Sequence, residues 1–200
     1  MKHTNEFKEY LIKYRYIKKL LPKPDTTKGL NSKQELKLRS CIMMFHSEIE
    51  VFIEKLCFKI LDNGLQTYKT KNIVLPKIAM LCLNCDQKSI KKLPTFKAIN
   101  DVVKLHKSYV SDKNHGIKKE HLKNIFGPLG MVEVYDESLL PLDFYEDLNF
   151  LSKHRGIAVH SSIKTFSDTK IMPSDILSKM ENINKNLEKL DEFIIKDLKS

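Results

Sequence analysis

Apolar residues recur at spacings of three and four positions along most of the chain, which is the pattern of amphipathic α-helices. The clearest stripe predicts a final helix with apolar positions Ile176, Met180, Ile183, Leu187, Leu190 and Ile194. Comparable stripes predict helices over about 5–21, 32–61, 75–84, 96–108, 121–126 and 142–160. The alternating segment 132–135 is too short and isolated to indicate a sheet. The chain is therefore predicted to be all-α, an antiparallel helical bundle.

Polar and turn-forming residues indicate where these helices begin and end. Ser32, with Glu35 three residues later, fits a capping box at the start of the long second helix. The stretch 62–64, Asp-Asn-Gly, is expected to stop that helix, because glycine readily adopts the left-handed conformation that closes many helices. Pro173 precedes the final helix, which we expect to begin directly after it.

The length of 200 residues suits one domain with a proper core. We expect a single helical domain over residues 1–200, whose core is formed by about 31–62 and 142–198. The stretch 85–141 holds lysine clusters and most of the loop signals. We interpret it as an irregular helical or loop insertion in the middle of the bundle and not as a second domain.

The composition narrows the classes of partner and compartment. Lysine and arginine total 35 against 25 aspartate and glutamate, a net charge of +10, which favours polyanions such as RNA. The alternative is that the lysines only keep the protein in solution. No apolar run is long enough to span a membrane, and the N-terminus lacks the apolar stretch of a secretory signal. We therefore expect a cytoplasmic protein without a membrane partner.

The four cysteines do not predict a metal centre. Cys41 and Cys57 fall inside a helical apolar pattern and are expected to be buried thiols. Cys82 and Cys85 form one CxxC, but a zinc site needs two more ligands at suitable spacing, and no second CxxC or HxxxH occurs. We expect neither a metal nor another cofactor.

The residues most suggestive of chemistry are 155–160, Arg-Gly-Ile-Ala-Val-His, at the end of a predicted helix. Arginine binds phosphate through a planar fork of donors, and histidine transfers protons near neutral pH. Arg155 falls on the apolar stripe of its helix, so it should either pair with an acid such as Glu48 or Glu50 or emerge at an edge. A purely structural role is the alternative, with Arg155 in such an ion pair and His160 closing the helix.

Helical geometry separates the two side chains of this pair. His160 follows Arg155 by five residues, which is about 140° around a helix. The two side chains therefore converge only if the helix bends, for which Gly156 is suited, or if helices of two subunits face each other.

The stretch resembles the R-x(4–6)-H signature of HEPN domains (higher eukaryotes and prokaryotes nucleotide-binding). The run 150–160, Phe-Leu-Ser-Lys-His-Arg-Gly-Ile-Ala-Val-His, is similar to the family's L-x-x-x-R-N-x-I-A-H. The predicted helix over 35–52 looks like the family's earlier core helix, and 173–176 with the final helix looks like the segment after its motif. The chain is most similar to the RiboL-PSP-type HEPN proteins of bacterial defence and toxin systems.

The resemblance implies an α-helical homodimer with a composite active site that cleaves RNA without a metal. In such a site Arg155 would hold the scissile phosphate, and His160 would act as general acid or base on the ribose 2′-OH or the leaving oxygen. The product would be a 2′,3′-cyclic phosphate. The family also implies a toxin or anti-phage effector, with a cognate antitoxin or a larger defence complex as partner.

One position departs from the family pattern. Gly156 stands where the family often has Asn or Asp, which marks either a flexible point or a non-catalytic member. His154 could supply the missing polar function, and Glu48 and Glu50 are candidate supporting residues. A non-catalytic HEPN-fold module that binds RNA or protein is therefore the alternative function. A DNA-binding regulator would need a helix-turn-helix, and we find no convincing one.

Basic and aromatic residues supply candidate contacts to RNA. Lys153, Lys118 and Lys119 are the expected substrate-binding lysines. The interleaved aromatic residues, among them Tyr68 and Tyr109, could stack on bases. The alternative is that the lysines are simply solvated and the aromatic residues belong to the core.

Overall fold

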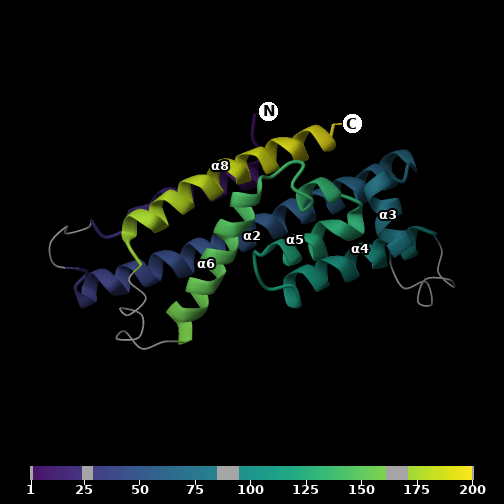
Figure 1. Ribbon diagram of the computed structural model, residues 1–200. Helices are drawn as coiled ribbons and strands as arrows, with labels where there is room; N and C mark the ends of the chain where they lie inside the picture. Colours follow the sequence, from purple (N-terminus) through teal and green to yellow (C-terminus); the bar gives the residue numbers. More distant parts are fainter. Residues whose placement is uncertain (1, 24–28, 85–94, 161–170, 200) are drawn as a thin grey trace.

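Every regular element of the described chain is helical (Figure 1). The structure is a computed structural model that describes residues 2–23, 29–84, 95–160 and 171–199. The α-helices are α1 Asn5–Lys18, α2 Ser32–Lys71, α3 Pro76–Asn84, α4 Thr95–Asp112, α5 Lys119–Phe126, α6 Leu142–His160 and α8 Pro173–Asp197. Two 3-10 turns, η2 Gly127–Leu129 and η3 Val132–Val134, follow α5. These ranges contain no strand, so the predicted all-α class is confirmed.

Helix α2, with 40 residues, is the central element against which the others pack. Its partner α1 runs antiparallel to it. The ring of Tyr14 packs against Phe45, with centroids 5.8 Å apart, and Phe7 at the other end of α1 packs against Phe52 at 5.6 Å. Burial of these aromatic rings along one stripe stabilises the α1–α2 pair.

Helix α8 lies along both of these helices. Its Asp191 accepts hydrogen bonds from the backbone N–H and the hydroxyl of Thr4, which itself caps α1, and Glu181 pairs with Lys18 at 2.7 Å. Helix α8 is thus antiparallel to α1 and parallel to α2. The predicted apolar seam of α8 is buried at every position, namely Ile176, Met180, Ile183, Leu187, Leu190 and Ile194.

Helix α6 crosses α2 obliquely and also contacts α8 (Figure 1). Asp147 of α6 accepts hydrogen bonds from Lys179 at 2.6 Å and from Asn182 at 2.7 Å, both on α8. Helices α6 and α8 are antiparallel, because Asn182 also lies 3.4 Å from Asp143, one turn earlier on α6. The first turns of α6 are in this way held against α8.

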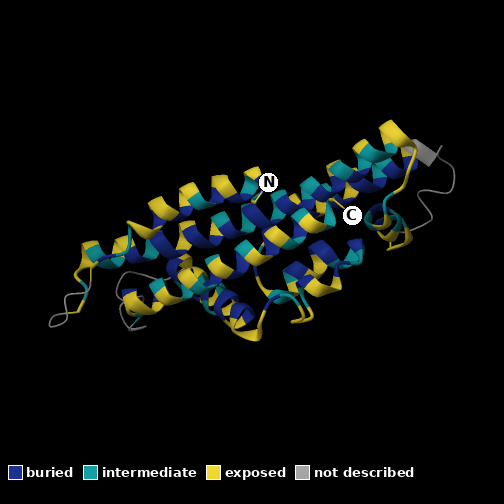
Figure 2. Ribbon diagram, turned by 90° about the horizontal axis from the view of Figure 1, so that it is seen from above, coloured by how far each residue is buried: buried dark blue, intermediate teal, exposed yellow. Residues whose placement is uncertain are grey.

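Helices α3, α4 and α5 pack beside the C-terminal half of α2, and their buried faces point inward (Figures 1 and 2). Ile78, Val103 and Ile125 belong to the same hydrophobic core as the residues of α2 and α8. His106 is buried there, with its Nε2 3.0 Å from the carbonyl oxygen of Ile125. The described part of the stretch 85–141 therefore extends the main core.

Two predicted boundaries of α2 are wrong. The capping box is formed by Asn31 and Gln34, one position before the predicted Ser32 and Glu35. The helix also continues through the predicted stop at 62–64 to Lys71, where Asn72 adopts the left-handed conformation with φ of 57°. Gly64 is helical and buried, and it does not end the helix. Its lack of a side chain allows α2 to pack closely against α3.

Replacing Gly64 with alanine is expected to destabilise the protein. The added Cβ would lie 2.3 Å from Cγ1 of Ile78, so this buried side chain would have to move within a packed core. Overpacking of this kind costs about 1–3 kcal/mol, which exceeds the gain of about 1 kcal/mol from the better helix former. Urea unfolding measures the change. The double variant with Ile78→Ala should show less than the sum of the two losses, and a Gly64→Ala protein at least as stable as wild type would contradict the packing.

Candidate functional site

The R-x4-H stretch occupies the last turns of α6. The helix is continuous from Leu142 to His160, and the predicted helix end near His160 borders residues 161–170, which lie outside the described ranges. Arg155 and His160 are both exposed. Since the helix continues regularly through Gly156, the five-residue spacing places the two side chains about 140° apart around its axis. One protomer therefore directs them to different sides.

Arg155 lies on the side of α6 that faces α2 and α5. Burial of the His46 ring, followed by the nearby positive charges of Arg155 and His121, lowers the pKa of His46 to about 4. His46 itself is only 6% exposed and stays neutral at physiological pH. The tertiary structure thus brings a buried, neutral histidine of α2 close to the arginine of the motif. No sequence pattern pointed to His46, although this polar residue lies directly beside the apolar stripe of α2.

The glutamates proposed as partners of Arg155 have other neighbours. Glu48 pairs with Lys13 of α1 at 2.8 Å. Glu50 lies on the correct side of α2, but its Oε2 is 4.0 Å from Nδ1 of His46. Across the ranges that the structure describes, no ion pair within 4.0 Å joins Arg155 to either carboxylate. Its guanidinium thus faces solvent, which suits binding of an external anion.

His154 points away from Arg155, toward α8. Its ring packs 4.1 Å from the ring centroid of Phe150, and its Nδ1 is buried without a hydrogen-bond partner. Burial, together with the positive charges of Lys153 and Lys179, lowers its pKa. His154 is therefore placed as a packing residue between α6 and α8, and its position does not substitute for a polar group at residue 156.

A second arginine holds the end of α6 against α2. Both Nε and Nη2 of Arg39 donate to the carbonyl oxygen of Ala158, with the Nε distance at 3.2 Å. Arg39 fixes the turn that carries His160. Nothing in the sequence pattern distinguished Arg39 from the other basic residues of α2.

Gly156 lies in open space on the outer surface of α6. A Cβ added to it would meet no atom within 4 Å, and the residue has no left-handed backbone that would require glycine. Its flexibility is thus unnecessary for the helix as it stands.

Replacing Gly156 with alanine is expected to raise the free energy of unfolding by about 1 kcal/mol, because alanine is the better helix former and nothing obstructs it. Urea unfolding of the two proteins measures this gain. The result complements Gly64→Ala, where the same change should destabilise. Stability equal to or below that of wild type would show that a bend at residue 156 contributes to the native state.

The three lysines expected to bind substrate gather near one surface of α5 and α6. Lys118 and Lys119 line a hollow of about 490 Å³ together with Asn149 of α6. Lys153 follows Asn149 by one turn on the same exposed face of α6. Lys119 also pairs with Glu137 at 2.6 Å, so part of its charge is neutralised. His160 lies on this outer face too, about 20° from the direction of Asn149.

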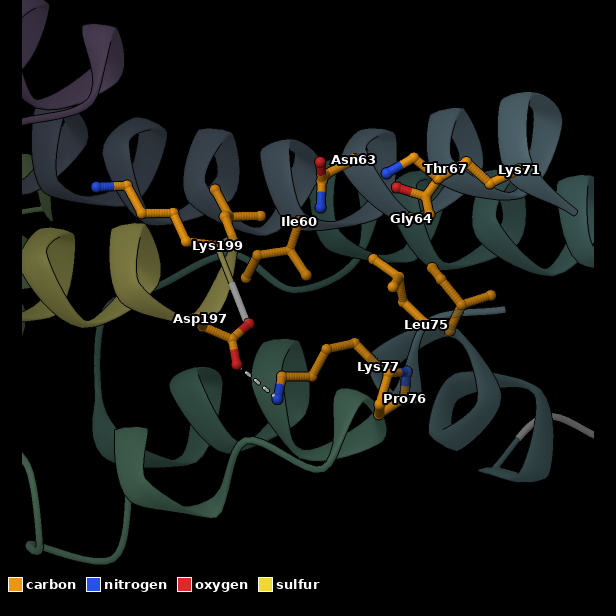
Figure 3. A pocket seen from close by; sticks show the side chains of 12 residues that line it. Ile60, Asn63, Gly64, Thr67, Lys71, Leu75, Pro76, Lys77, Asp197 and Lys199 are labelled. Carbon is orange, nitrogen blue, oxygen red and sulfur yellow. Dashed lines mark ion pairs between the residues drawn. The ribbon is translucent and has the colours of Figure 1, made fainter. Parts of the chain in front are cut away.

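Another cavity, of about 520 Å³, lies at the far end of α2, between α2, the start of α3 and the end of α8 (Figure 3). Ile60 and Leu75 contribute apolar surface, and Lys77 pairs with Asp197 across it at 2.8 Å. None of its 12 lining residues is a histidine or a cysteine, and none belongs to the motif. This cavity therefore lacks the groups that the proton-transfer chemistry of the motif would need.

The cysteines behave as the sequence predicted where they are described. Cys41 and Cys57 are buried thiols, and burial raises the pKa of each to about 12. Cys82 is half-buried, and Cys85 lies outside the described residues. Within the described ranges, no group of three or more His, Cys, Asp or Glu side chains is arranged to hold a metal ion.

None of the helices described above combines the length and the apolar character that crossing a bilayer requires. Comparisons with models of known protein families, with curated proteins and with solved structures find no match to this chain.

Proposed function

We propose that this protein is a metal-independent endoribonuclease of the HEPN type. The observation that carries the proposal is the pair Arg155 and His160, both exposed in the last turns of one helix of a basic, all-α chain. No carboxylate of the described ranges forms an ion pair with the Arg155 guanidinium, which suits it to bind a phosphate, and the exposed imidazole of His160 is accessible for proton exchange.

The reaction follows from these two groups. The ribose 2′-oxygen attacks the adjacent phosphorus while a histidine accepts its proton, and the bond to the 5′-oxygen breaks as that oxygen gains a proton. Arg155 stabilises the negative charge that develops on the phosphate oxygens. The products are a 2′,3′-cyclic phosphate and a free 5′-hydroxyl. DNA is not a substrate, because it lacks the 2′-OH.

The site is proposed to be shared between two protomers. The 140° separation within one α6 favours Arg155 of one chain acting with His160 of another. Three exposed apolar residues beside the motif support a dimer surface: Val159 at the end of α6, and Leu36 and Met43 of α2, which flank Arg39. Exposed apolar surface of this kind is typical of a protein interface.

The first experiment is cleavage of a labelled RNA by the purified protein. We expect products ending in a 2′,3′-cyclic phosphate, full activity in EDTA, and no cleavage where a single 2′-deoxynucleotide replaces the ribose at the scissile position. A metal requirement, or cleavage at the deoxynucleotide, would rule out the proposed chemistry.

The shared site is tested by mixing two inactive variants, Arg155→Ala and His160→Ala. A mixed dimer has one intact pair, so activity should reappear on mixing, and sedimentation should show a dimer at the assay concentration. Activity of a monomer, or no recovery in a mixture shown to contain mixed dimers, would exclude a composite site.

A role as a toxin or anti-phage effector, with a cognate antitoxin or a larger complex, belongs to the same proposal. Expression in bacteria should then arrest growth, and Arg155→Ala should relieve the arrest. The alternative function, a non-catalytic module of this fold that binds RNA or protein, is favoured by Gly156 at the position after the motif arginine. Salt-sensitive RNA binding without cleavage, even at high protein concentration, would support this alternative function.

A further inference from the structure

Two hollows adjoin on the face formed by α3, α4, α5 and α6. The first is the lysine-lined hollow beside Asn149, and the second has a volume of about 540 Å³. They share two lining residues, Lys123 and Tyr135, so they form one continuous surface. This surface belongs to the part of the chain that the resemblance to HEPN domains does not cover.

The second hollow has the character of a site for planar, partly apolar groups. Tyr109 and Tyr135 contribute aromatic rings, and Leu105 and Pro128 contribute apolar surface. The Tyr109 ring stacks on His106 at a centroid distance of 6.3 Å and an angle of 17°, and it remains 37% exposed. A ring held in this way is a platform on which an unpaired base can stack at little entropic cost.

The first hollow has the character of a site for phosphate. It contains Lys118, Lys119 and Lys123 against one acidic lining residue, Glu120. Within the part of the chain that the structure describes, Lys118 and Lys123 form no ion pair within 4.0 Å. Both ammonium groups are therefore available to an external anion. Tyr135 lines both hollows. An RNA strand with a base in the second hollow would therefore place a neighbouring phosphate in the first.

The first hollow, which the lysines line, leads toward the candidate site. Asn149, Lys153 and His160 share the outer face of α6, within about 40° of one another, and His160 lies about 16 Å along the axis from Asn149. A strand leaving the hollow along this face meets Lys153 first and His160 at the end of the helix.

We propose that the two adjoining hollows bind single-stranded RNA, with unpaired bases on Tyr109 and Tyr135 and phosphates on Lys118 and Lys123, and direct the strand along α6 to His160. This inference rests on the proposed function and names the form of its substrate. A duplex is excluded from this surface, because its bases are stacked inside the helix. An acidic peptide would use the lysines but has no need of the aromatic hollow.

The test measures binding in the full-length His160→Ala protein, so that cleavage does not interfere. The probe is a fluorescein-labelled RNA of about 12 nucleotides, a length within the range of single-strand-binding grooves. Anisotropy is recorded at several salt concentrations, with a duplex of the same sequence and with polyglutamate as competitors. Circular dichroism confirms the fold of each variant.

Removal of one stacking ring by Tyr135→Ala or Tyr109→Ala should weaken binding about 10-fold or more, whereas Tyr135→Phe should bind like the parent protein. Lys123→Ala should weaken binding and reduce the salt slope by about one, while Lys8→Ala on α1 should leave both unchanged. Duplex should compete poorly. These results together support the proposal.

Wild-type affinity in both tyrosine variants would overturn it. Equal competition by duplex, or by polyglutamate at matched charge, would also overturn it, because charge alone would then explain binding. Failure of this binding site and failure of the proposed function give different results. If the wild-type protein binds RNA through the tyrosines but cuts no RNA, the binding site is supported and the nuclease activity is refuted. If the tyrosine variants bind RNA normally and the wild-type protein cuts it, the nuclease activity is supported and the binding site is refuted.

Discussion

Replacing Arg155 with alanine is expected to lower the rate of RNA cleavage by about 100- to 1,000-fold. The guanidinium would stabilise the charge that develops on the phosphate, and removal of one such donor typically costs a factor of this size. The loss should appear mainly in kcat, since that charge is greatest in the transition state. Initial rates on a labelled RNA measure it.

His160→Ala is expected to cost about 100- to 10,000-fold through loss of proton transfer. Matched controls are Arg15→Ala on α1 and His115→Ala before α5, both exposed residues outside the site, which should cut at the wild-type rate. Since Arg155 and His160 are exposed, neither variant should lose stability, as unfolding curves can verify. Wild-type cleavage by both Arg155→Ala and His160→Ala would refute the assignment of the site.

Acid should destabilise the protein through His46 by about 3 kcal/mol between about pH 7 and about pH 4. The unfolded chain takes up a proton near the ordinary histidine value of 6.5, whereas the folded protein holds the pKa of His46 at about 4. The unfolded state thus binds more protons as the pH falls through this window, so the contribution of His46 is complete above pH 6.5 and is lost toward pH 4. The lowered pKa values of His106 and His154 act in the same direction.

The variant His46→Gln isolates this effect. Glutamine does not titrate, so the difference in unfolding free energy between the two pH values should be smaller by about 3 kcal/mol in the variant than in wild type. Urea unfolding across the range provides the measurement. Identical pH dependence of wild type and His46→Gln would mean that His46 is not held neutral.

Most of the helices could be predicted because their signals are local. The periodic apolar stripe of α8 depends on residues three and four positions apart, and its prediction is confirmed. The end of α2 could not be predicted in this way. Gly64 resembled a terminator, but its actual constraint is the side chain of Ile78 on another helix.

The neighbours of the candidate site residues could be determined only from the folded chain. Glu48 and Glu50 are two residues apart, and from the sequence alone they are equally plausible partners for Arg155. The packing of α1 on α2 pairs Glu48 with Lys13, and the crossing of α6 over α2 places Arg155 near His46. These relations depend on how side chains interlock between helices and on the crossing angles that result, which local periodicity does not encode.

The sequence by itself determined the helical class, the positions of most helices, and the presence of an arginine and a histidine five residues apart at a helix end. The first two follow from backbone geometry that repeats every 3.6 residues, and the third is read directly from the residues. Only the tertiary structure decided that Arg39 holds the last described turn of α6 and that the buried His46 lies near enough to Arg155 to feel its charge. It also decided that the lysines of α5 lie next to α6. Such neighbours are distant along the chain, and only the burial of apolar faces against each other brings them together.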